Sequence, residues 1–393
     1  MTRALSFSLF FAVALGVIGS THYYVWMRLV RDAAVPQLLH HFGTGALLVL
    51  GCSIPAAMLL SRLVPVHLSR PWLLLTYCWM GLFFMLLSAT AGLDLLRAVV
   101  WGLKHSFFAA QPDLAPLQRL AVQRTFALVA ALTGVIGTCV ALYTVRQGPQ
   151  VRSVAVALKR FPAALDGFTV AQLSDLHVAP LLGRVYVEDV VDKVLAQRPS
   201  LIVLTGDFVD GSVAQLRDGV APLARLQAPH GVFFITGNHE YYSGADAWIA
   251  ELTRLGIRVL RNQRVAVGSA QAGFDLAGID DFTAAQFGGG HGADLAKALQ
   301  GRDPTRELIL LAHQPKAIDE AAQLGVGLML SGHTHGGQIF PFGAIVRLVQ
   351  PYLKGLYRRG DTQIYVNPGT GYWGPPMRLG APPEITLLTL RRG

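Results

Sequence analysis

The stretch "GLMLSGHTHGGQ", residues 327–338, places two histidines one residue apart, directly after an apolar run, and brackets them with glycines. The apolar run has the length and composition of a buried strand, and glycines let the backbone bend sharply or pass close to a ligand. Two imidazoles at such a bend indicate either a metal site or a polar turn that happens to carry histidines. The fragment alone leaves both interpretations open.

Four other apolar runs also end in side chains that can bind a metal. Helical patterns alternate with these runs, so the second half of the chain predicts a layered α/β domain whose strands are buried on both faces. In open α/β sheets, ligands gather at the carboxyl ends of the strands. The four runs are "QLSDLH" with Asp175 and His177, "IVLTGDFVD" with Asp207 and Asp210, "FFITGNHE" with Asn238 and His239, and "LILLAHQP" with His313.

Each motif also has a purely structural interpretation, because an Asp or His after a strand is often a turn former or a helix N-cap. The functional interpretation rests on the set, since five strand ends in succession deliver oxygen and nitrogen ligands. The spacing of Asp175 and His177 would turn both side chains to one side of an extended strand end, and His333 and His335 repeat it. Two divalent ions about 3.5–4 Å apart need such a mixture of carboxylates and neutral imidazoles.

The ordered motifs D-x-H, G-D-x-x-D, G-N-H-E, H and G-H-T-H resemble the calcineurin-like metallophosphoesterases over residues 166–390, and most of all their membrane-linked bacterial subgroup. The resemblance implies an α/β four-layer fold, which is a β-sandwich flanked by helices. It also implies a centre of two divalent metal ions (Mn, Fe or Zn, with Mn favoured). The implied reaction is hydrolysis of a phosphoester or pyrophosphate bond by metal-bound hydroxide, and some relatives act on a lipid-linked substrate.

The same resemblance implies roles for single residues. His239 would lie near the leaving group and stabilise or protonate it, and Asp210 would orient His239 or another histidine. Asp207 would bridge the two metals. The remaining ligands would be Asp175, His177 and His335 for the first metal, and Asn238, His313 and His333 for the second.

Residues 1–150 differ in composition from the rest of the chain. They hold the long apolar runs and ten Lys or Arg against three acidic residues, a net charge of +7, whereas the remainder carries 23 against 21. Such a basic, apolar region suggests lipid headgroups as a partner and does not suggest nucleic acid. The three cysteines lie in the apolar runs, where buried packing is the expected role.

Four segments are long enough to span a bilayer, which requires about 20 apolar residues. The first could instead be a signal peptide, and the scarcity of ionisable residues in the spans argues against a transport pathway. The expected spans are approximately 4–27, 42–60, 71–93 and 125–145. The expected domains are a transmembrane region over 1–150, a linker over 151–165 and a metallophosphoesterase domain over 166–393.

These segments predict a multi-pass protein of a bacterial inner or plasma membrane. Lys and Arg divide seven to six between its two sides, so the positive-inside rule leaves the orientation open. We expect the catalytic domain on the cytoplasmic side. A membrane-tethered sensor or scaffold that binds metal without turnover is the alternative to an enzyme, and the complete ligand set argues against it.

Two further features have more than one interpretation. "FPFGAIVRLVQPYLKGLYRRG", residues 340–360, mixes apolar and basic residues directly after the last motif. It is either a lip that touches the bilayer and admits an amphiphilic substrate, or an ordinary strand and loop. Arg378 either contacts a substrate phosphate or faces solvent from a loop.

Overall fold

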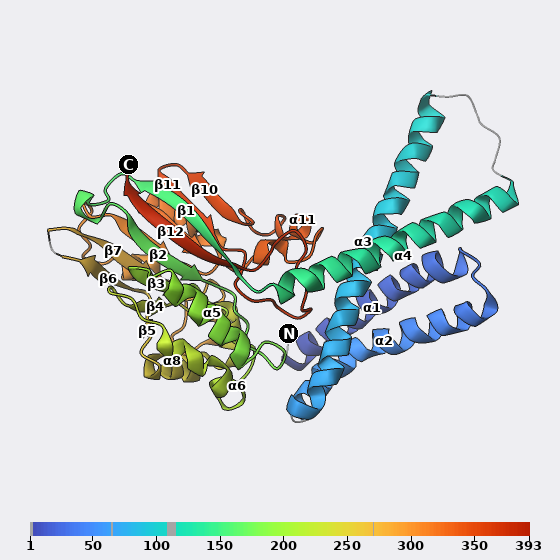
Figure 1. Cartoon of the computed structure of the whole chain (residues 1–393), viewed down its shortest axis with the longest axis horizontal. Coiled ribbons are helices and arrows are strands. Elements are labelled where there is room, and N and C mark those ends of the chain that lie inside the picture. The colour runs from blue at the N-terminus through green and yellow to red at the C-terminus, as the bar shows by residue number, and fades with distance from the viewer. Residues whose placement is uncertain (1–2, 64–65, 108–114, 270) are drawn as a thin grey trace. The chain divides into compact units, whose positions relative to one another are not determined.

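The computed structural model describes residues 3–63, 66–107, 115–269 and 271–393, and the chain divides into two compact units. Unit 1 comprises Met1–Leu142 and unit 2 comprises Tyr143–Gly393. Long helices make up unit 1, whereas strands and shorter helices make up unit 2 (Figure 1). Because all the predicted metal motifs fall in unit 2, that unit carries the candidate site.

Unit 1 is built from α1 (Arg3–Trp26), the π-helical turn η1 (Met27–Arg31), α2 (Gln37–Leu63), α3 (Val66–Phe107) and α4 (Pro116–Arg146). The last turn of α4, Tyr143–Arg146, belongs to unit 2. Within the described residues, three stretches are long and apolar enough to cross a membrane, namely Gln37–Ala57, Leu68–Lys104 and Leu117–Arg146. The predicted span 4–27 coincides with α1, and the side chains at its start lie outside the described part of the chain. The structure therefore supports three candidate spans in place of the four that were predicted.

The strands of unit 2 form two mixed six-stranded sheets. In spatial order, the first sheet consists of β1 (Gln150–Leu158), β12 (Glu384–Arg392), β2 (Phe168–Leu173), β3 (Leu201–Leu204), β4 (Val232–Phe234) and β5 (Arg258–Val259). The second consists of β10 (Gly355–Arg359), β11 (Thr362–Val366), β9 (Leu328–Ser331), β8 (Leu308–Leu311), β7 (Gly273–Gly278) and β6 (Gln263–Gly268). Strands β2 to β5 pair in parallel, as do β11, β9, β8 and β7. The carboxyl ends of the strands that carry the motifs therefore share an edge within each sheet.

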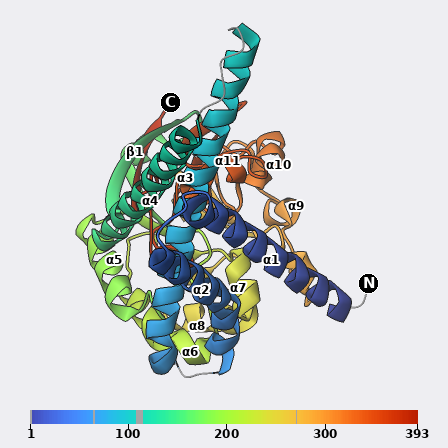
Figure 2. The same cartoon turned by 90° about the vertical axis from the view of Figure 1, so that its right-hand side faces the viewer.

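Helices cover the outer face of each sheet, while the inner faces pack against each other. Phe168 and Val203 of the first sheet share a buried core with Phe274 and Leu328 of the second. The main helices and helical turns of unit 2 are α5 (Arg184–Ala196), α6 (Val213–Val220), α7 (Asn238–Ser243), α8 (Ala245–Arg254), α9 (Leu295–Ala298), α10 (Ile318–Gln323), η6 (His335–Gly337) and α11 (Gly343–Val346). Apolar residues of α5 and α8 pack on the first sheet and those of α9 and α10 on the second. Figure 2 accordingly shows α9 and α10 on the opposite side of the unit from α5.

The segment 151–158, which the sequence assigns to the linker, forms most of β1. It pairs in parallel with β12 along its whole length, from Gln150 opposite Glu384 to Leu158 opposite Arg392. Only Val156 and Leu158 are buried, and the first half of the strand is mostly exposed. The first sheet therefore begins before the predicted domain boundary, because an edge strand needs few buried side chains.

Candidate metal centre

The five motif-bearing loops converge where the carboxyl ends of the two sheets meet. Strands β2, β3 and β4 belong to the first sheet, and β8 and β9 belong to the second. Among the described residues, the structure brings candidate ligands together in three overlapping groups, in each of which the ligand atoms lie within 4.8 Å of one another. The groups are Asp175, His177 and His335; Asp207, His313 and His333; and His177, Asp210 and His239.

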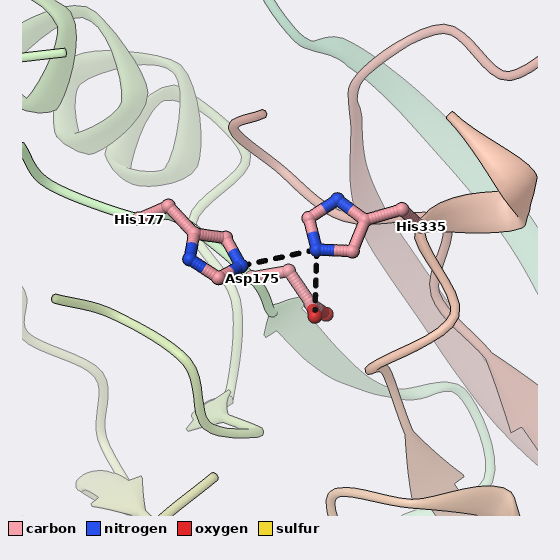
Figure 3. Close-up of side chains that lie close together, drawn as sticks. All are labelled: Asp175, His177 and His335. Atoms are coloured by element: carbon pink, nitrogen blue, oxygen red, sulfur yellow. Dashed lines mark hydrogen bonds and ion pairs between the residues drawn. The ribbon is translucent and has the colours of Figure 1, made fainter. Parts of the chain in front are cut away.

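The first group joins the loop after β2 to the loop after β9. The Nε2 atom of His335 lies 3.0 Å from Nε2 of His177 and 3.4 Å from a carboxylate oxygen of Asp175. Figure 3 shows these three side chains pointing toward one another from different strand ends. Two imidazole nitrogens and a carboxylate therefore face a common point.

The second group lies beside the first and is centred on Asp207. The Oδ2 atom of Asp207 is 3.0 Å from Nε2 of His313 and 4.0 Å from Nε2 of His177, which belongs to the first group. The other ring nitrogen of His313 contacts the Thr205 carbonyl at 2.7 Å, which orients Nε2 toward Asp207. The ring of His333 completes the group, with its centroid 5.1 Å from that of His313.

Asp210 holds two histidines at once. Its Oδ1 atom lies 3.1 Å from Nδ1 of His177 and 2.5 Å from Nδ1 of His239. Asp210 therefore contacts His239, the partner named from the sequence, and also His177. Next to His239, the side-chain oxygen of Asn238 is buried and has no hydrogen-bond partner.

The backbone of the candidate ligands differs from the expected extended strand end. The prediction that Asp175 and His177 share one side because side chains alternate along a strand is wrong, because both residues have left-handed φ angles of 51° and 52°. Left-handed φ is uncommon outside glycine and clusters at functional sites. Asp207, His333 and His335 share this conformation. A tight backbone turn after each strand, rather than strand alternation, aims these side chains.

Glycine is needed where the loops pass closest to one another. A Cβ atom at Gly332 would lie 2.2 Å from a carboxylate oxygen of Asp175, and one at Gly237 would lie 2.2 Å from Oδ1 of Asp207. No side chain fits at such distances. The two glycines thus let the β9 and β4 loops approach the two carboxylates.

Burial and neighbouring charges set the protonation of the site. Burial lowers the pKa of His333 to about 3, and burial together with His177 and Arg378 lowers the pKa of His335 well below its usual range. Burial raises the pKa of Asp207, but His313 and His239 outweigh it and hold that pKa well below its usual range. His333 and His335 are therefore neutral, the form of imidazole that binds divalent cations, whereas burial at His313 is outweighed by Asp207, which raises the pKa of that ring well above its usual range.

His239 differs from the other histidines. Burial alone would lower its pKa, but Asp207 and Asp210 raise it to about 9. Its ring is partly exposed, whereas those of His177 and His313 are buried. An imidazole that is protonated at neutral pH and reaches solvent has the properties of a proton donor.

The site fits divalent cations on two independent observations. The side-chain oxygen of Asn238 is buried beside Asp207 without a hydrogen-bond partner, although buried polar atoms are normally satisfied. The Nε2 atoms of His177 and His335 also converge to 3.0 Å, beside a carboxylate oxygen of Asp175. The set of carboxylate, imidazole and amide ligands suits borderline first-row metals.

Comparison with known proteins points to the same chemistry. The profile of the calcineurin-like phosphoesterase family matches residues 168–337. A transmembrane protein with metallophosphoesterase domain from Bos taurus is 37% identical over 81% of this chain and 73% of its own length. A protein of the same name from Danio rerio is 33% identical over 100% of this chain and 91% of its own, and an uncharacterised metallophosphoesterase of Helicobacter pylori is 39% identical over 62% and 64%. The chain belongs to the calcineurin-like phosphoesterase family.

Membership makes this chain a metal-dependent phosphoesterase of a family that uses two divalent ions, and its relatives include proteins named as transmembrane. The predicted resemblance is confirmed, as is the α/β fold with two mixed sheets. The comparisons name a family and do not assign single residues. The candidate site of this phosphoesterase is therefore defined by the residues that its own loops bring together.

Glu240 has a larger part in the phosphoesterase site than hydrogen bonding within its own turn. Its buried carboxylate accepts hydrogen bonds from the backbone N–H groups of Gly237, Asp207 and Phe208, at 2.7, 3.0 and 2.7 Å. One side chain of α7 thus fixes the backbone on both sides of Asp207. The sequence indicates this role only through the presence of Glu240 in the G-N-H-E motif. Asp207 and Phe208 lie more than thirty residues away, so no local pattern predicts their hydrogen bonds to Glu240.

Both sequence interpretations of Arg378 are wrong, because its side chain is completely buried. The guanidinium donates hydrogen bonds to the carbonyl groups of Pro368, Gly371, Ala381 and His335. It thereby satisfies the carbonyls of Pro368, Gly371 and Ala381, which lie outside the strands and helices, and adds a bond to that of His335. Arg378 is a buried cation that holds the loop behind His335 in this phosphoesterase.

Proposed function

We propose that this chain is a membrane-anchored dinuclear phosphoesterase that hydrolyses a phosphoester or pyrophosphate bond. The observation that carries the proposal is the position of Asp207, whose carboxylate lies between the Nε2 atoms of His313 and His177, at 3.0 and 4.0 Å. These histidines belong to different ligand groups, so one carboxylate can serve two cations. A single structural ion would not require this doubled arrangement.

The proposed division of ligands follows the two groups. Asp207 is the bridging ligand. Asn238 joins the second metal because its unpartnered oxygen belongs to the loop beside Asp207. The first metal is assigned Asp175, His177 and His335, and the second is assigned Asn238, His313 and His333.

When bound, two divalent cations supply Lewis-acid charge to the phosphoryl oxygens and activate the attacking water. The chain supplies the proton for the leaving group. Asp210 holds Nδ1 of His239, so Nε2 is the ring atom that can protonate the oxygen released as the P–O bond breaks. The backbone N–H of His239 also donates to Oδ1 of Asp207 at 2.8 Å, which couples the proton donor to the bridging carboxylate.

The membrane part of the proposal includes features beyond the three candidate spans. We assign residues 1–150 to a four-span anchor in which α1 is the first span, and we assign the remainder to the catalytic region. The proposed setting is a bacterial inner or plasma membrane with the catalytic unit on the cytoplasmic side, and Mn²⁺ is the proposed metal. An anchor raises the local concentration of phosphorylated lipids, so a lipid-linked phosphate or pyrophosphate is the proposed substrate class.

The test is turnover by the full-length protein with Mn²⁺ on a chromogenic phosphodiester, a phosphomonoester and an extract of membrane lipids followed by mass spectrometry. We expect Asp207→Ala to abolish hydrolysis, because it removes a ligand of both ions. We expect His239→Ala to lower kcat by about 10²–10⁴-fold with metal content unchanged, since it removes only the proton donor.

Glu251→Gln is the matched control, because this buried carboxylate lies on α8, pairs with Arg254 and Arg217, and belongs to none of the ligand groups. Its activity should equal that of the wild-type protein. A wild-type protein that retains two metal ions but hydrolyses none of these substrates would contradict the proposal and favour a metal-binding scaffold.

A further inference from the structure

We infer that an exposed apolar patch beside the metal centre docks on the surface of an anionic bilayer. The patch consists of Phe340, Phe342, Ile345, Leu348 and Val349, on and around the short helix α11. The inference rests on the membrane anchoring in the proposed function, and it adds a second membrane contact made by the catalytic unit itself.

The patch concentrates exposed apolar side chains in a short stretch of unit 2. Five large hydrophobic side chains are exposed within residues 340–349, and Leu348 is 83% exposed. Leu353 is buried, and its side chain lies 3.0 Å from the position of a Cβ at Gly343 of α11. Contiguous apolar surface of this kind marks an interaction site, because isolated exposed residues need no partner but a cluster does.

The charge around the patch indicates which partner covers it. Residues 339–360 contain four basic residues, Arg347, Lys354, Arg358 and Arg359, and no acidic residue. Arg347, next to Leu348 in the chain, and Arg358 are exposed. Exposed apolar side chains in a basic segment match a bilayer with anionic headgroups, where the apolar groups enter the interface and the cations remain among the phosphates.

The chain enters unit 2 at the end of a candidate span, through the last turn of α4. The last turn of α4 belongs to unit 2, and Val145 packs on the core of that unit. Four residues after the end of α4, the N–H of Gln150 donates to the carbonyl of Pro383 at 3.0 Å. The chain therefore enters the catalytic unit from a candidate membrane helix directly onto the segment 379–384.

The same segment, 379–384, supports the patch. The N–H of Phe340 donates to the Leu379 carbonyl at 2.9 Å, and the Lys354 ammonium donates to the Gly380 carbonyl. Figure 1 shows α11 at the end of unit 2 away from the C-terminus, which is the end where β12 begins. The point where the chain enters unit 2 and the patch thus both contact the segment 379–384.

The patch also adjoins the metal centre. Gln338, two residues before Phe340, exchanges hydrogen bonds with the backbone of Trp373 at 2.8 and 3.0 Å. The exposed Trp373 ring lies 5.7 Å from the ring of His239. Tryptophan favours the boundary between headgroups and acyl chains. Docking would therefore hold the proton donor at headgroup depth and select substrates whose phosphate lies in the bilayer surface.

The test measures the depth of single residues in the full-length protein, reconstituted in nanodiscs of phosphatidylcholine and phosphatidylglycerol that each hold one copy. Cys52, Cys78 and Cys139 are replaced by serine, and one cysteine is introduced at a time and labelled with a fluorophore. Lipid-borne spin labels then quench any fluorophore that enters the bilayer. We expect several-fold stronger quenching at Leu348→Cys than at Val185→Cys, which is matched in exposure at 80% but lies on α5.

Leu132→Cys in α4 is the control for anchoring, because this residue is exposed within a candidate span. Strong quenching at Leu132→Cys with none at Leu348→Cys would overturn the docking and leave the anchoring intact. No quenching at Leu132→Cys would overturn the anchoring, and the docking with it. If quenching at Leu348→Cys appeared only in nanodiscs that hold two copies, the patch would contact a second copy of this chain. That outcome would also overturn the inference.

Two further arms separate docking from other effects. Replacing Phe342 and Ile345 by serine should remove most of the quenching at Leu348→Cys, and omission of phosphatidylglycerol should weaken it. Because the measurement needs no turnover, an inactive protein would count against the proposed hydrolysis and not against the docking. Quenching that is unchanged in the doubly substituted protein would overturn the assignment of the patch.

Discussion

His333 and His335 are separated by one residue, yet their side chains belong to different ligand groups. His335 contacts Asp175 and His177, whereas the ring of His333 lies beside His313. The backbone N–H of His333 also donates to both carboxylate oxygens of Asp175, at 2.9 and 3.0 Å. The main chain of His333 therefore contacts the first ligand group while its side chain belongs to the second. A side-chain substitution at His333 would leave this backbone hydrogen bond intact.

We therefore predict that each histidine controls a different ion. His335→Ala should lose the metal held with Asp175 and His177, and His333→Ala should lose the metal held with Asn238 and His313. Each variant should retain about one ion per chain when measured by inductively coupled plasma mass spectrometry, because the other ligand set is complete. If both variants lost both ions equally, the assignment of ligands would be wrong.

Arg378 is predicted to matter for stability because its guanidinium satisfies four loop carbonyls. Arg378→Met should lower the free energy of unfolding by about 2–4 kcal/mol, since each unsatisfied buried group costs about 1–3 kcal/mol and part of the loop can rehydrate. Thermal unfolding of the full chain in detergent measures the effect. Arg347→Met is the control and should change stability by less than about 0.5 kcal/mol, because Arg347 is exposed.

The helix α7 and the loop after β3 form a single supported unit through Glu240. Three backbone N–H groups, those of Gly237, Asp207 and Phe208, share its two carboxylate oxygens. The carboxylate is enclosed, so these bonds are not exchanged for bonds to water. The position of Asp207 therefore depends on a neighbouring element as well as on its own strand.

Glu240→Gln should weaken this support, because an amide has one acceptor oxygen and no charge. We expect a loss of about 1–3 kcal/mol in the free energy of unfolding and a fall in kcat of about 10–100-fold, with KM little changed. Steady-state kinetics and thermal unfolding together measure the two effects. Glu251→Gln, on the neighbouring helix α8, should leave kcat unchanged, and a Glu240→Gln protein with normal kcat would contradict the positioning role.

The strands that position the site are predictable from sequence because they are buried on both faces. Every residue of β3, β8 and β9 is buried, so each appears in the sequence as a short continuous apolar run. Strand β1 is not predictable in this way, because its first half is largely exposed and its partner β12 lies more than two hundred residues away. The burial of Arg378 is not predictable from the neighbouring sequence either. Its hydrogen-bond partners are backbone carbonyl groups that only the tertiary fold brings together.

The candidate metal centre connects the two sheets of unit 2. Asp175, His177, Asp207 and Asn238 follow strands of the first sheet, while His313, His333 and His335 follow strands of the second. Ions bound here would cross-link the sheets at their carboxyl ends. Metal binding and the stability of the whole catalytic unit are therefore linked.

Removal of metal by a chelator should lower the midpoint of thermal unfolding of the full-length protein. Binding at a free metal concentration of about 100 times Kd stabilises a protein by about 2.7 kcal/mol, and two ions contribute more than one. Addition of excess Mn²⁺ should restore the midpoint. Asp207→Ala should show no such response, and an equal response in this variant would mean that the stabilising ions bind elsewhere.

Five candidate ligands have a left-handed backbone, which lowers the stability of the fold but positions the side chains for metal binding. They are Asp175, His177, Asp207, His333 and His335. Glycine suits such angles best, and any other residue there costs of order 1–3 kcal/mol. At each of these positions the residue that relaxes the main chain is one that removes a ligand. In metal-free protein, glycine at any of these turns should relieve the strain, whereas in metal-loaded protein the lost ligand outweighs that relief. The bound ions would thus offset the conformational cost of the turns that hold them.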